Sequence, residues 1–331
     1  MRTRYLRHVA ASATLLLWAV GAVSAQTWKP MRPVALVVGA APGGSIDLTA
    51  RLLQRTWDQQ RLVPTPVVVV NKAGAGQGIA WAYMIEKGGD GLAIAMGGPN
   101  LASNPVLGTH TIGYQDVTTV AMLFDDYMAF VVRADSPLKS MREVVERLRK
   151  DPGSLSIACA PSLGSGAHMG AVMGLRGGGV DVKNVRFVVY KSAGEAMTAA
   201  IAGEVDVVSG TVANFPPHLP GGRIRVIGVT SPQRLGGVMA AVPTLKDQGI
   251  DGVYTNWRSV IGPKNMAREH VAYWEGVTAR AVQTEEWQKD LERNFWTANF
   301  LTGKAARDYV SQQGELFRSV FIELGLAKNL K

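Results

Sequence analysis

Short strand-like runs alternate with helical patterns along most of this 331-residue chain, and this alternation constrains its fold more than any other feature. Such alternation predicts βα units and an α/β fold with largely parallel sheets. The length suffices for about two domains at roughly 150 residues each. The predicted strands span residues 34–38, 67–70, 92–96, 128–132, 155–158, 185–190, 205–208 and 224–229.

The clearest helix lies between the first two predicted strands. Its apolar residues Ile46, Ala50, Leu53 and Trp57 are spaced i, i+4, i+7 and i+11, which places them on one helical face. The segment after Pro263 shows two long helical patterns and little strand signal. Beyond the first helix, the sequence predicts helices at residues 79–86, 141–150, 167–175, 195–202, 268–282 and 304–324.

The N-terminus has the form of a secretory signal peptide. Three arginines in the first seven residues precede an uncharged run at 9–23, and small residues follow up to Ala25, where we predict cleavage. The run of 15 residues is shorter than the roughly 20 that span a bilayer. Gln26, rather than Cys, follows the predicted cleavage position, so a lipid anchor is not indicated. We therefore expect an exported protein in a bacterial periplasm.

Charge and cysteine content exclude several function classes. Removing residues 1–25, which carry three Arg and no acid, lowers the formal net charge from +9 to 9 − 3 = +6. The remaining Lys and Arg are dispersed among acids, so a nucleic-acid partner is not expected. The single cysteine, Cys159, excludes an internal disulfide framework and a Cys-rich metal site, and its apolar neighbours predict a buried strand residue.

Three Gly-rich turns, each at the end of a predicted strand and the start of a helix, are the candidate functional elements. We name them the first loop (residues 39–47), the second loop (71–79) and the third loop (161–168). Glycines let a ligand approach the backbone, and the free N–H groups of a first helical turn favour an anion. Ser45 either caps its helix or donates its hydroxyl to a ligand. These loops predict an anion site without a dedicated cation, at the carboxyl ends of the strands.

Nucleotide chemistry and catalysis find little support in the motifs. Ser45 stands where a P-loop needs Lys, and Ile79 stands where the dinucleotide fingerprint needs Gly. The histidines after residue 25 have no metal-binding spacing, and no G-x-S-x-G motif occurs, so we expect no metal, no cofactor and no catalysis. Asp47 has two open roles, interaction with the helix N-terminus or contact with a ligand through water.

The loop sequences resemble the periplasmic solute-binding proteins of tripartite tricarboxylate transporters, the TctC or Bug (Bordetella uptake gene) family. The resemblance rests mainly on residues 41–51, 70–76 and 164–168, with Thr255–Arg258 similar to the tricarboxylate-binding branch. It implies a type II periplasmic binding protein fold, in which two α/β domains joined by two crossovers enclose a ligand cleft. The expected limits are 26–125 plus 245–331 for one domain and 126–244 for the other.

The same resemblance implies which residues bind the ligand. In similar proteins the first loop holds one carboxylate, partly through ordered waters. This chain lacks the usual aromatic residue and second proline before Pro42, and it has Ser192 where the family has Gly. Lys191 either neutralises a second carboxylate or is simply solvated. The predicted ligand-binding residues are Pro42, Gly43, Gly44, Ser45, Asp47, Gly74, Ala75, Gly76, Gly164, Ser165, His168, Lys191 and Ser192.

The sequence thus predicts a non-catalytic, monomeric periplasmic receptor. It would capture a di- or tricarboxylate, citrate-like, or another small carboxylate, and deliver it to membrane transporter subunits. One alternative is a sensor subunit that presents its ligand to a membrane kinase. Another is an exported hydrolase using Ser165 and His168, which is disfavoured because the two are three residues apart at a helix start without an orienting acid.

Overall fold

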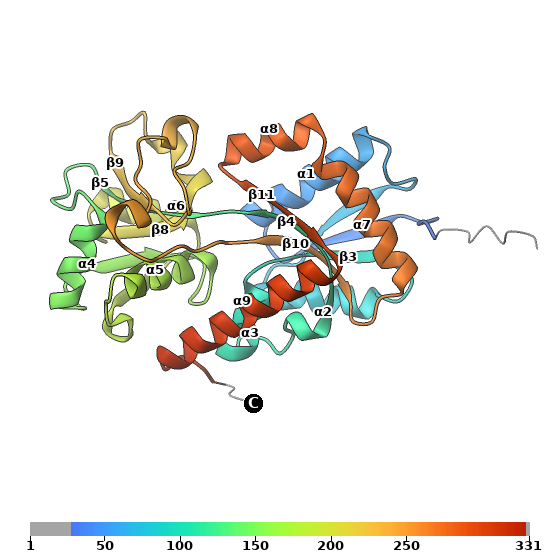
Figure 1. The fold of residues 1–331 in the computed structure, drawn as a ribbon, viewed down its shortest axis with the longest axis horizontal. Helices are drawn as coiled ribbons and strands as arrows, with labels where there is room; N and C mark the ends of the chain where they lie inside the picture. Colours follow the sequence, from blue (N-terminus) through green and yellow to red (C-terminus); the bar gives the residue numbers. More distant parts are fainter. Residues whose placement is uncertain (1–27, 329–331) are drawn as a thin grey trace, which may run out of the picture.

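The computed structural model describes residues 28–328, which form two β-sheets flanked by helices (Figure 1). The two sheets lie side by side along the longest axis of the molecule, so the chain is divided into two halves. The predicted signal peptide, residues 1–25, lies outside the described residues. Among the helices of residues 28–328, none is both long enough and apolar enough to cross a bilayer.

The first half is built around a six-stranded sheet. Its strands are β1 (Val34–Val38), β2 (Val67–Asn71), β3 (Ala93–Gly97), β4 (Val117–Asp125), β10 (Arg258–Pro263) and β11 (Thr297–Thr302), in the spatial order β11-β4-β10-β3-β1-β2. Its helices are α1 (Ser45–Gln59), α2 (Gly78–Lys87), α3 (Asn100–Leu107), α7 (Arg268–Val282), α8 (Glu285–Asn294) and α9 (Gly303–Glu323). Helices α1, α7 and α8 cover one face, and α2 with the first half of α9 covers the other.

The second half contains five strands and three helices. The strands are β5 (Met128–Arg133), β6 (Ser156–Cys159), β7 (Arg186–Val189), β8 (Val207–Thr211) and β9 (Ile224–Val229), in the spatial order β7-β6-β8-β5-β9. Helices α4 (Met141–Lys150) and α5 (Gly166–Gly177) cover one face, and α6 (Ala193–Ala202) covers the other. Cys159 is buried in the core beneath α4 and α5, and burial raises the pKa of its thiol to about 12.

Every strand and helix predicted from the sequence is present, with small shifts at the ends. The amphipathic spacing in α1 is confirmed, because Ile46, Ala50, Leu53 and Trp57 are all buried. The indole ring of Trp57 lies 5.5 Å from that of Trp274 on α7, and the same core cluster includes Leu36 and Ile94 of the sheet, so this face of α1 packs against both α7 and the sheet.

The expectation of largely parallel sheets is wrong. In residues 28–328, β1 pairs in parallel with β2 and β3, and β6 with β7 and β8, but β4, β5, β10 and β11 are antiparallel to their neighbours. The reason is the route of the chain. It leaves the first sheet at the end of β4 and enters the second sheet through β5, so β5 runs opposite to β6, β7 and β8. It returns through β10 from the same junction, so β10 runs opposite to β3 and β4, and β11, which follows β10 after α7 and α8, has the direction of β10.

Among the strands and α-helices of residues 28–328, five were not predicted from the sequence, namely α3, β4, α8, β10 and β11. Helix α3 has only eight residues and contains Pro105, which weakens a helical pattern. Strand β11 is an edge strand without a fully buried side, so its residues do not alternate clearly between apolar and polar. The expectation of little strand structure after Pro263 is therefore wrong at Thr297–Thr302.

Two segments connect the halves, one at residues 125–128 and the other at 254–258 (Figure 1). Leu245, Ile250 and Tyr254 pack in the same core as α4 and α5. We therefore propose that the second domain spans residues 126–254, ten residues beyond the limit of 126–244 expected from the sequence. Helix α9 belongs to both halves, since Val310 packs on the first sheet and Phe321 in the core of the second.

Candidate functional site

The ends of the two sheets face each other across the connecting segments. Strands β1, β2 and β3 end at the edge where β4 ends and β10 begins. Strands β6, β7 and β8 end at the edge where β5 begins. Because the chain passes directly from β4 to β5, these two edges are adjacent. The three Gly-rich loops follow β1, β2 and β6, so all of them lie at this junction, where α/β proteins bind ligands.

Asp47 fixes the shape of the first loop. Its carboxylate is buried and accepts hydrogen bonds from the Gly43 backbone N–H (2.8 Å), from Arg51 Nε (2.9 Å) and from Asn71 Nδ2 (2.7 Å). Burial alone would raise the pKa of Asp47, but the bonds from Arg51, Gly43 and Asn71 outweigh it and hold the pKa below its ordinary value. The carboxylate thus ties the first loop to the end of β2.

Arg258, the first residue of β10, places a guanidinium beside the start of α1. The residue is only 6% exposed, and Nη2 donates to Ser45 Oγ at 3.3 Å. Nη1 donates to the carbonyls of Asn256 (3.0 Å) and Trp257 (3.1 Å), while Nε has no hydrogen-bond partner among residues 28–328. We expected the Gly-rich loops to form an anion site without a dedicated cation. This expectation is wrong for the first loop, because the Arg258 guanidinium lies beside it.

Asp126 lies on the other connecting segment and partly balances this charge. Its Oδ2 is 3.6 Å from Arg258 Nη2 and accepts from Asn256 Nδ2 at 3.3 Å. Burial raises the pKa of Asp126 to about 6, although Arg258 and the hydrogen bonds oppose this rise. A Cβ added at Gly166, the first residue of α5, would lie 2.6 Å from Asn256 Oδ1. The two connecting segments and the N-termini of α1 and α5 therefore converge.

Helix α3 holds the second loop. The Asn104 side chain donates to the carbonyl of Gly76 at 2.8 Å and to that of Ala75 at 3.4 Å. At the start of α3, Asn100 Oδ1 accepts from Gln77 Nε2 at 3.1 Å. The exposed Gly74 thus stands at the tip of a loop whose base is fixed by amide hydrogen bonds.

The third loop is packed more tightly than the other two. Ser165 caps α5 by accepting from the His168 N–H (3.4 Å), and its hydroxyl donates to the carbonyl of Ala160 (3.2 Å). His168 Nδ1 accepts from the Gly164 N–H at 3.1 Å. Gly164 lies against Leu107 of α3, so this loop contacts the first half of the molecule.

Lys191 and Ser192 follow β7, at the same sheet edge as the third loop. The Ser192 hydroxyl accepts from the Glu195 N–H at 3.2 Å, and Glu195 Oε2 accepts from the Lys191 N–H at 3.1 Å. Ser192 is thus the N-cap of α6, and the Glu195 carboxylate holds the backbone of the preceding residue, Lys191. Both Lys191 and Ser192 are exposed to solvent.

The family comparison assigns this arrangement. The TctC family model, described as "Tripartite tricarboxylate transporter family receptor", matches residues 50–316. The chain belongs to the TctC family. BugT of Bordetella pertussis is 26% identical to it over 314 residues, which cover 92% of each chain. Family members of this type are periplasmic binding proteins, and the resemblance drawn from the loop sequences is confirmed.

Solved structures confirm the expected two-domain periplasmic binding protein fold of this TctC protein. A TctC solute binding protein from Polaromonas is 25% identical, with a TM-score of 0.71 over 89% of this chain and 99% of that chain. Rpa4515 of R. palustris, solved with adipate, is 22% identical, with a TM-score of 0.78 over 90% of this chain and 99% of that chain.

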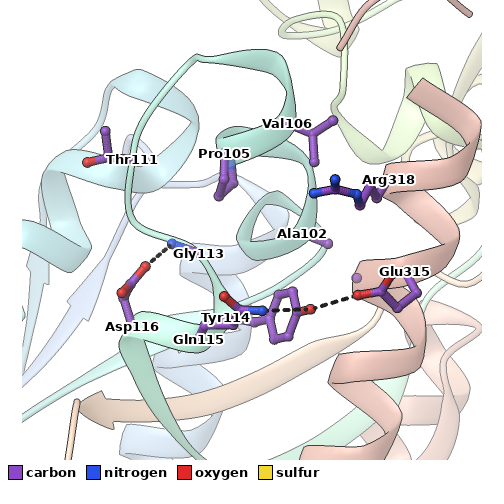
Figure 2. Close-up of a pocket in the computed structure, with 11 residues that line it drawn as sticks. Ala102, Pro105, Val106, Thr111, Gly113, Tyr114, Gln115, Asp116, Glu315 and Arg318 are labelled. Carbon is purple, nitrogen blue, oxygen red and sulfur yellow. Dashed lines mark hydrogen bonds between the residues drawn. The ribbon is translucent and has the colours of Figure 1, made fainter. Parts of the chain in front are cut away.

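Two cavities of the TctC protein lie away from the first and second loops. One, of about 260 Å³, lies between α3, residues 111–116 and α9, where Tyr114 Oη donates to Glu315 Oε1 at 3.4 Å (Figure 2). The other, also about 260 Å³, is lined by His168 and lies beside β7. Within residues 28–328, no group of three or more His, Cys, Asp or Glu side chains is arranged to hold a metal ion.

The sequence analysis identified the loops but missed the polar residues that connect them. Arg258 and Asn256 stood in the stretch that marked the family resemblance, yet neither was assigned a role in the site. A signal for Arg258 exists, because a lone charge between Trp257 and an apolar strand must be paired or face a ligand. Asp126 and Asn104 carry no such local signal, since only the fold brings them to the junction.

Proposed function

We propose that this TctC-family periplasmic solute-binding protein captures a small di- or tricarboxylate at the junction of its two sheets and delivers it to a tripartite tricarboxylate transporter. The observation that carries the proposal is Arg258, a buried guanidinium beside the Ser45 hydroxyl at the N-terminus of α1. A carboxylate there meets a cation, a hydroxyl and free backbone N–H groups together. The adipate found with Rpa4515 supports a ligand with two carboxylates.

Energetics support this assignment. Micromolar binding corresponds to about −8 kcal/mol. A charge-assisted hydrogen bond contributes roughly 1.5–3 kcal/mol net, so a few of them suffice after the entropic costs of association. In this proposal Pro42, Gly43, Gly44 and Ser45 bind the first carboxylate together with Arg258, and Asp47 shapes the loop without touching the ligand.

The second carboxylate is assigned to the opposite edge. Lys191 is exposed at the end of β7, and Ser192 lies beside it at the start of α6. The exposed tip of the second loop, Gly74 with Ala75 and Gly76, completes the wall between these positions. Gly164, Ser165 and His168 are buried and bonded to one another, so in this proposal they set the position of the third loop.

The proposal includes export and the absence of catalysis. We propose a periplasmic monomer whose signal peptide is cleaved after Ala25. The Ser165 hydroxyl already donates to a carbonyl, and His168 Nδ1 accepts from a backbone N–H, so these two side chains do not form a nucleophile and its base.

A thermal-shift screen of residues 26–331 tests the ligand class. Mono-, di- and tricarboxylates of two to eight carbons, with matched amides as controls, are added one at a time. A ligand at 100 times its Kd stabilises the protein by about 2.7 kcal/mol, which is a measurable rise in Tm. We expect a rise with a dicarboxylate or tricarboxylate and none with its amide. No rise with any carboxylate would overturn the proposal.

A further inference from the structure

The guanidinium of Arg258 lies between the proposed carboxylate site and a carboxyl group of the protein itself. Nη2 donates to Ser45 Oγ at the first loop, and the same nitrogen is 3.6 Å from Asp126 Oδ2. Nη1 instead donates to the backbone carbonyls of Asn256 (3.0 Å) and Trp257 (3.1 Å). A ligand carboxylate bound beside Ser45 therefore meets the nitrogen that attracts Asp126, and two anions compete for one cation.

Asp126 is held where its charge depends on Arg258. The residue is fully buried, Oδ1 accepts from the Tyr127 N–H at 2.9 Å, and Oδ2 accepts from Asn256 Nδ2 at 3.3 Å. Both of these donors are neutral, whereas Arg258 supplies a positive charge that favours the ionised carboxylate. A ligand anion that neutralises Arg258 would leave the buried Asp126 charge poorly compensated, and uptake of a proton would remove that cost.

Tyrosines and a second acid surround this carboxyl. Burial raises the pKa values of Tyr127 and Tyr254 on the connecting segments and of Tyr309 on α9, so all three stay neutral at pH 8 and below. Asp125, the last residue of β4, adjoins Asp126 in the chain. Burial also raises the pKa of Asp125, although its hydrogen bonds oppose the rise, so this acid needs its own control.

The acid and the histidine of the adjoining loops change charge in more acidic solution. Burial would raise the pKa of Asp47, but its hydrogen bonds outweigh this effect and hold the pKa below its ordinary value. Burial lowers the pKa of His168 to about 4. Asp126, with its pKa raised by burial to about 6, titrates closer to neutral pH than either of them.

We propose that ligand capture is coupled to protonation of Asp126, so that the arriving carboxylate pairs with Arg258 while Asp126 takes up a proton from the solvent. This inference rests on the proposed function, because it concerns the regulation of the same site. Asp126 is then a positioning residue, which acts on the ligand through Arg258. The proton and the ligand strengthen each other's binding by the same factor, so the affinity for a dicarboxylate rises as the pH falls.

Calorimetric titration of the protein with malate and with adipate at pH 6.5, 7 and 8 tests this coupling. Both compounds are largely dianions over this range, so their own protonation contributes little. A coupling factor of about tenfold, which is typical of linked sites, should make the Kd about threefold lower at pH 6.5 than at pH 8. Titrations in buffers of different ionisation enthalpy should then show uptake of about half a proton at pH 6.5.

Variants assign the proton to one carboxyl group. Asp126→Asn removes the titrating group but keeps an oxygen that accepts from the Tyr127 N–H, so its Kd should be equal at pH 6.5 and pH 8, without proton uptake. Asp125→Asn is the matched control and should retain both effects. His110→Gln is a second control, because His110 packs against Gly78 at the end of the second loop, and it should also retain them.

The outcomes separate this inference from the proposed function. If neither malate nor adipate binds at any pH, the proposed function fails and the coupling fails with it. Binding with equal Kd values at pH 6.5 and pH 8 and no proton uptake would overturn the coupling alone. Uptake that persists in Asp126→Asn, or that is lost in either control, would also overturn it.

Infrared difference spectra of the wild type provide a measurement that does not depend on the folding of Asp126→Asn. Ligand binding at pH 6.5 should produce the C=O band of a newly protonated carboxyl group. The band should shift when aspartate is labelled with ¹³C, and it should remain in Asp125→Asn. Absence of the band, or its loss in Asp125→Asn, would contradict protonation of Asp126.

Discussion

Arg258 is a charged side chain that the fold buries and only partly neutralises. Its nearest carboxylate, on Asp126, lies 3.6 Å away, and its Nε is unpartnered among residues 28–328. Burying a guanidinium is costly unless the charge is paired. The Ser45 hydroxyl beside it offers a dipole but no charge. A ligand carboxylate bound between Ser45 and Arg258 would neutralise the rest of the guanidinium charge. Ligand binding would then offset the free-energy cost of burying Arg258.

Replacing Ser45 tests this pairing at the level of one atom. Ser45→Ala removes the hydroxyl, and we expect the Kd for the carboxylate found in the screen to rise about fivefold, or roughly 1 kcal/mol. The Tm without ligand should fall only slightly, because Ser45 makes no side-chain cap of α1 and its hydroxyl accepts a single hydrogen bond of 3.3 Å, from Arg258 Nη2. Calorimetric titration measures the first effect and a thermal scan the second. A fall in the apo Tm with unchanged affinity would show that Ser45 is structural, and Ser319→Ala on α9 is the exposed control.

Asp126 should make the free energy of unfolding depend on pH, and the direction of its pKa shift fixes the sign of this dependence. Its folded pKa of about 6 exceeds the unfolded value of about 3.9, so the folded state binds the proton more tightly. This contribution to stability is fully present below pH 4 and is lost as the pH rises to 6. The free energy of unfolding of wild type minus that of Asp126→Asn should therefore decrease from pH 4 to pH 6. Urea titrations at several pH values measure it, and a flat difference would contradict the burial of a charged Asp126.

His168 should show the opposite trend over nearly the same range. Its folded pKa of about 4 lies below the unfolded value of about 6.5. Its contribution to stability is present above pH 6.5 and is lost as the pH falls towards 4. The free energy of unfolding of wild type minus that of His168→Asn should thus increase from pH 4 to pH 6.5 in the same urea titrations. Parallel trends for the two variants would refute the assigned environments.

At the level of elements, α3 connects two of the loops. Asn104 binds the second loop, and Leu107 packs against Gly164 of the third. Gly164 has φ +79°, a conformation that L side chains rarely adopt, and a Cβ added there would collide with the end of the Leu107 side chain unless that side chain moved. The position of the third loop therefore depends on both the backbone conformation of Gly164 and the side chain of Leu107 on α3.

Two glycine substitutions separate these contributions. Gly164→Ala incurs the left-handed penalty and the collision with Leu107, whereas Gly222→Ala, at φ +59° with open space around it, incurs the penalty alone. We expect Gly164→Ala to lower the free energy of unfolding by about 1–3 kcal/mol more than Gly222→Ala does. Adding Leu107→Ala should recover part of this difference. Equal losses in the two glycine variants would mean that the contact between the third loop and α3 is loose.

The elements also show how far the sequence can be interpreted. The period of Ile46, Ala50 and Trp57 locates α1 because a helix buried on one face must repeat its apolar residues. The glycines of the first loop can also be recognised from the sequence, because they are neighbours in the chain between a predicted strand and a predicted helix. Arg258 is 213 residues from Ser45, and they meet only because the chain returns into β10 after crossing the junction. Contacts made by topology leave no periodic signal, which is why the sequence analysis assigned no role in the site to Arg258, Asn256 or Asp126.

At the scale of the whole molecule, α9 joins the two halves. Val310 packs against the first sheet, and Phe317 and Phe321 pack in the core of the second. Tyr309, also on α9, contacts both connecting segments. Its hydroxyl lies 3.0 Å from Thr255 Oγ1 and donates to Asp125 Oδ1 at 3.3 Å. One helix thus contacts both cores and both connecting segments, so the halves should not be independent in stability.

We therefore expect the protein to unfold in one cooperative transition, and Phe321→Ala tests this coupling. Truncating the fully buried ring should cost about 3–5 kcal/mol, because it removes apolar contacts and leaves a cavity. If α9 couples the halves, hydrogen exchange should become faster in β1 and β3 of the first sheet as well as in β6 and β8. The control is Ile322→Ala, at the next position on α9. The Ile322 residue is 46% exposed, so its truncation should change the hydrogen-exchange rates little. Two separate calorimetric transitions, of which Phe321→Ala moves only one, would show that the halves fold independently and that α9 merely rests on the second core.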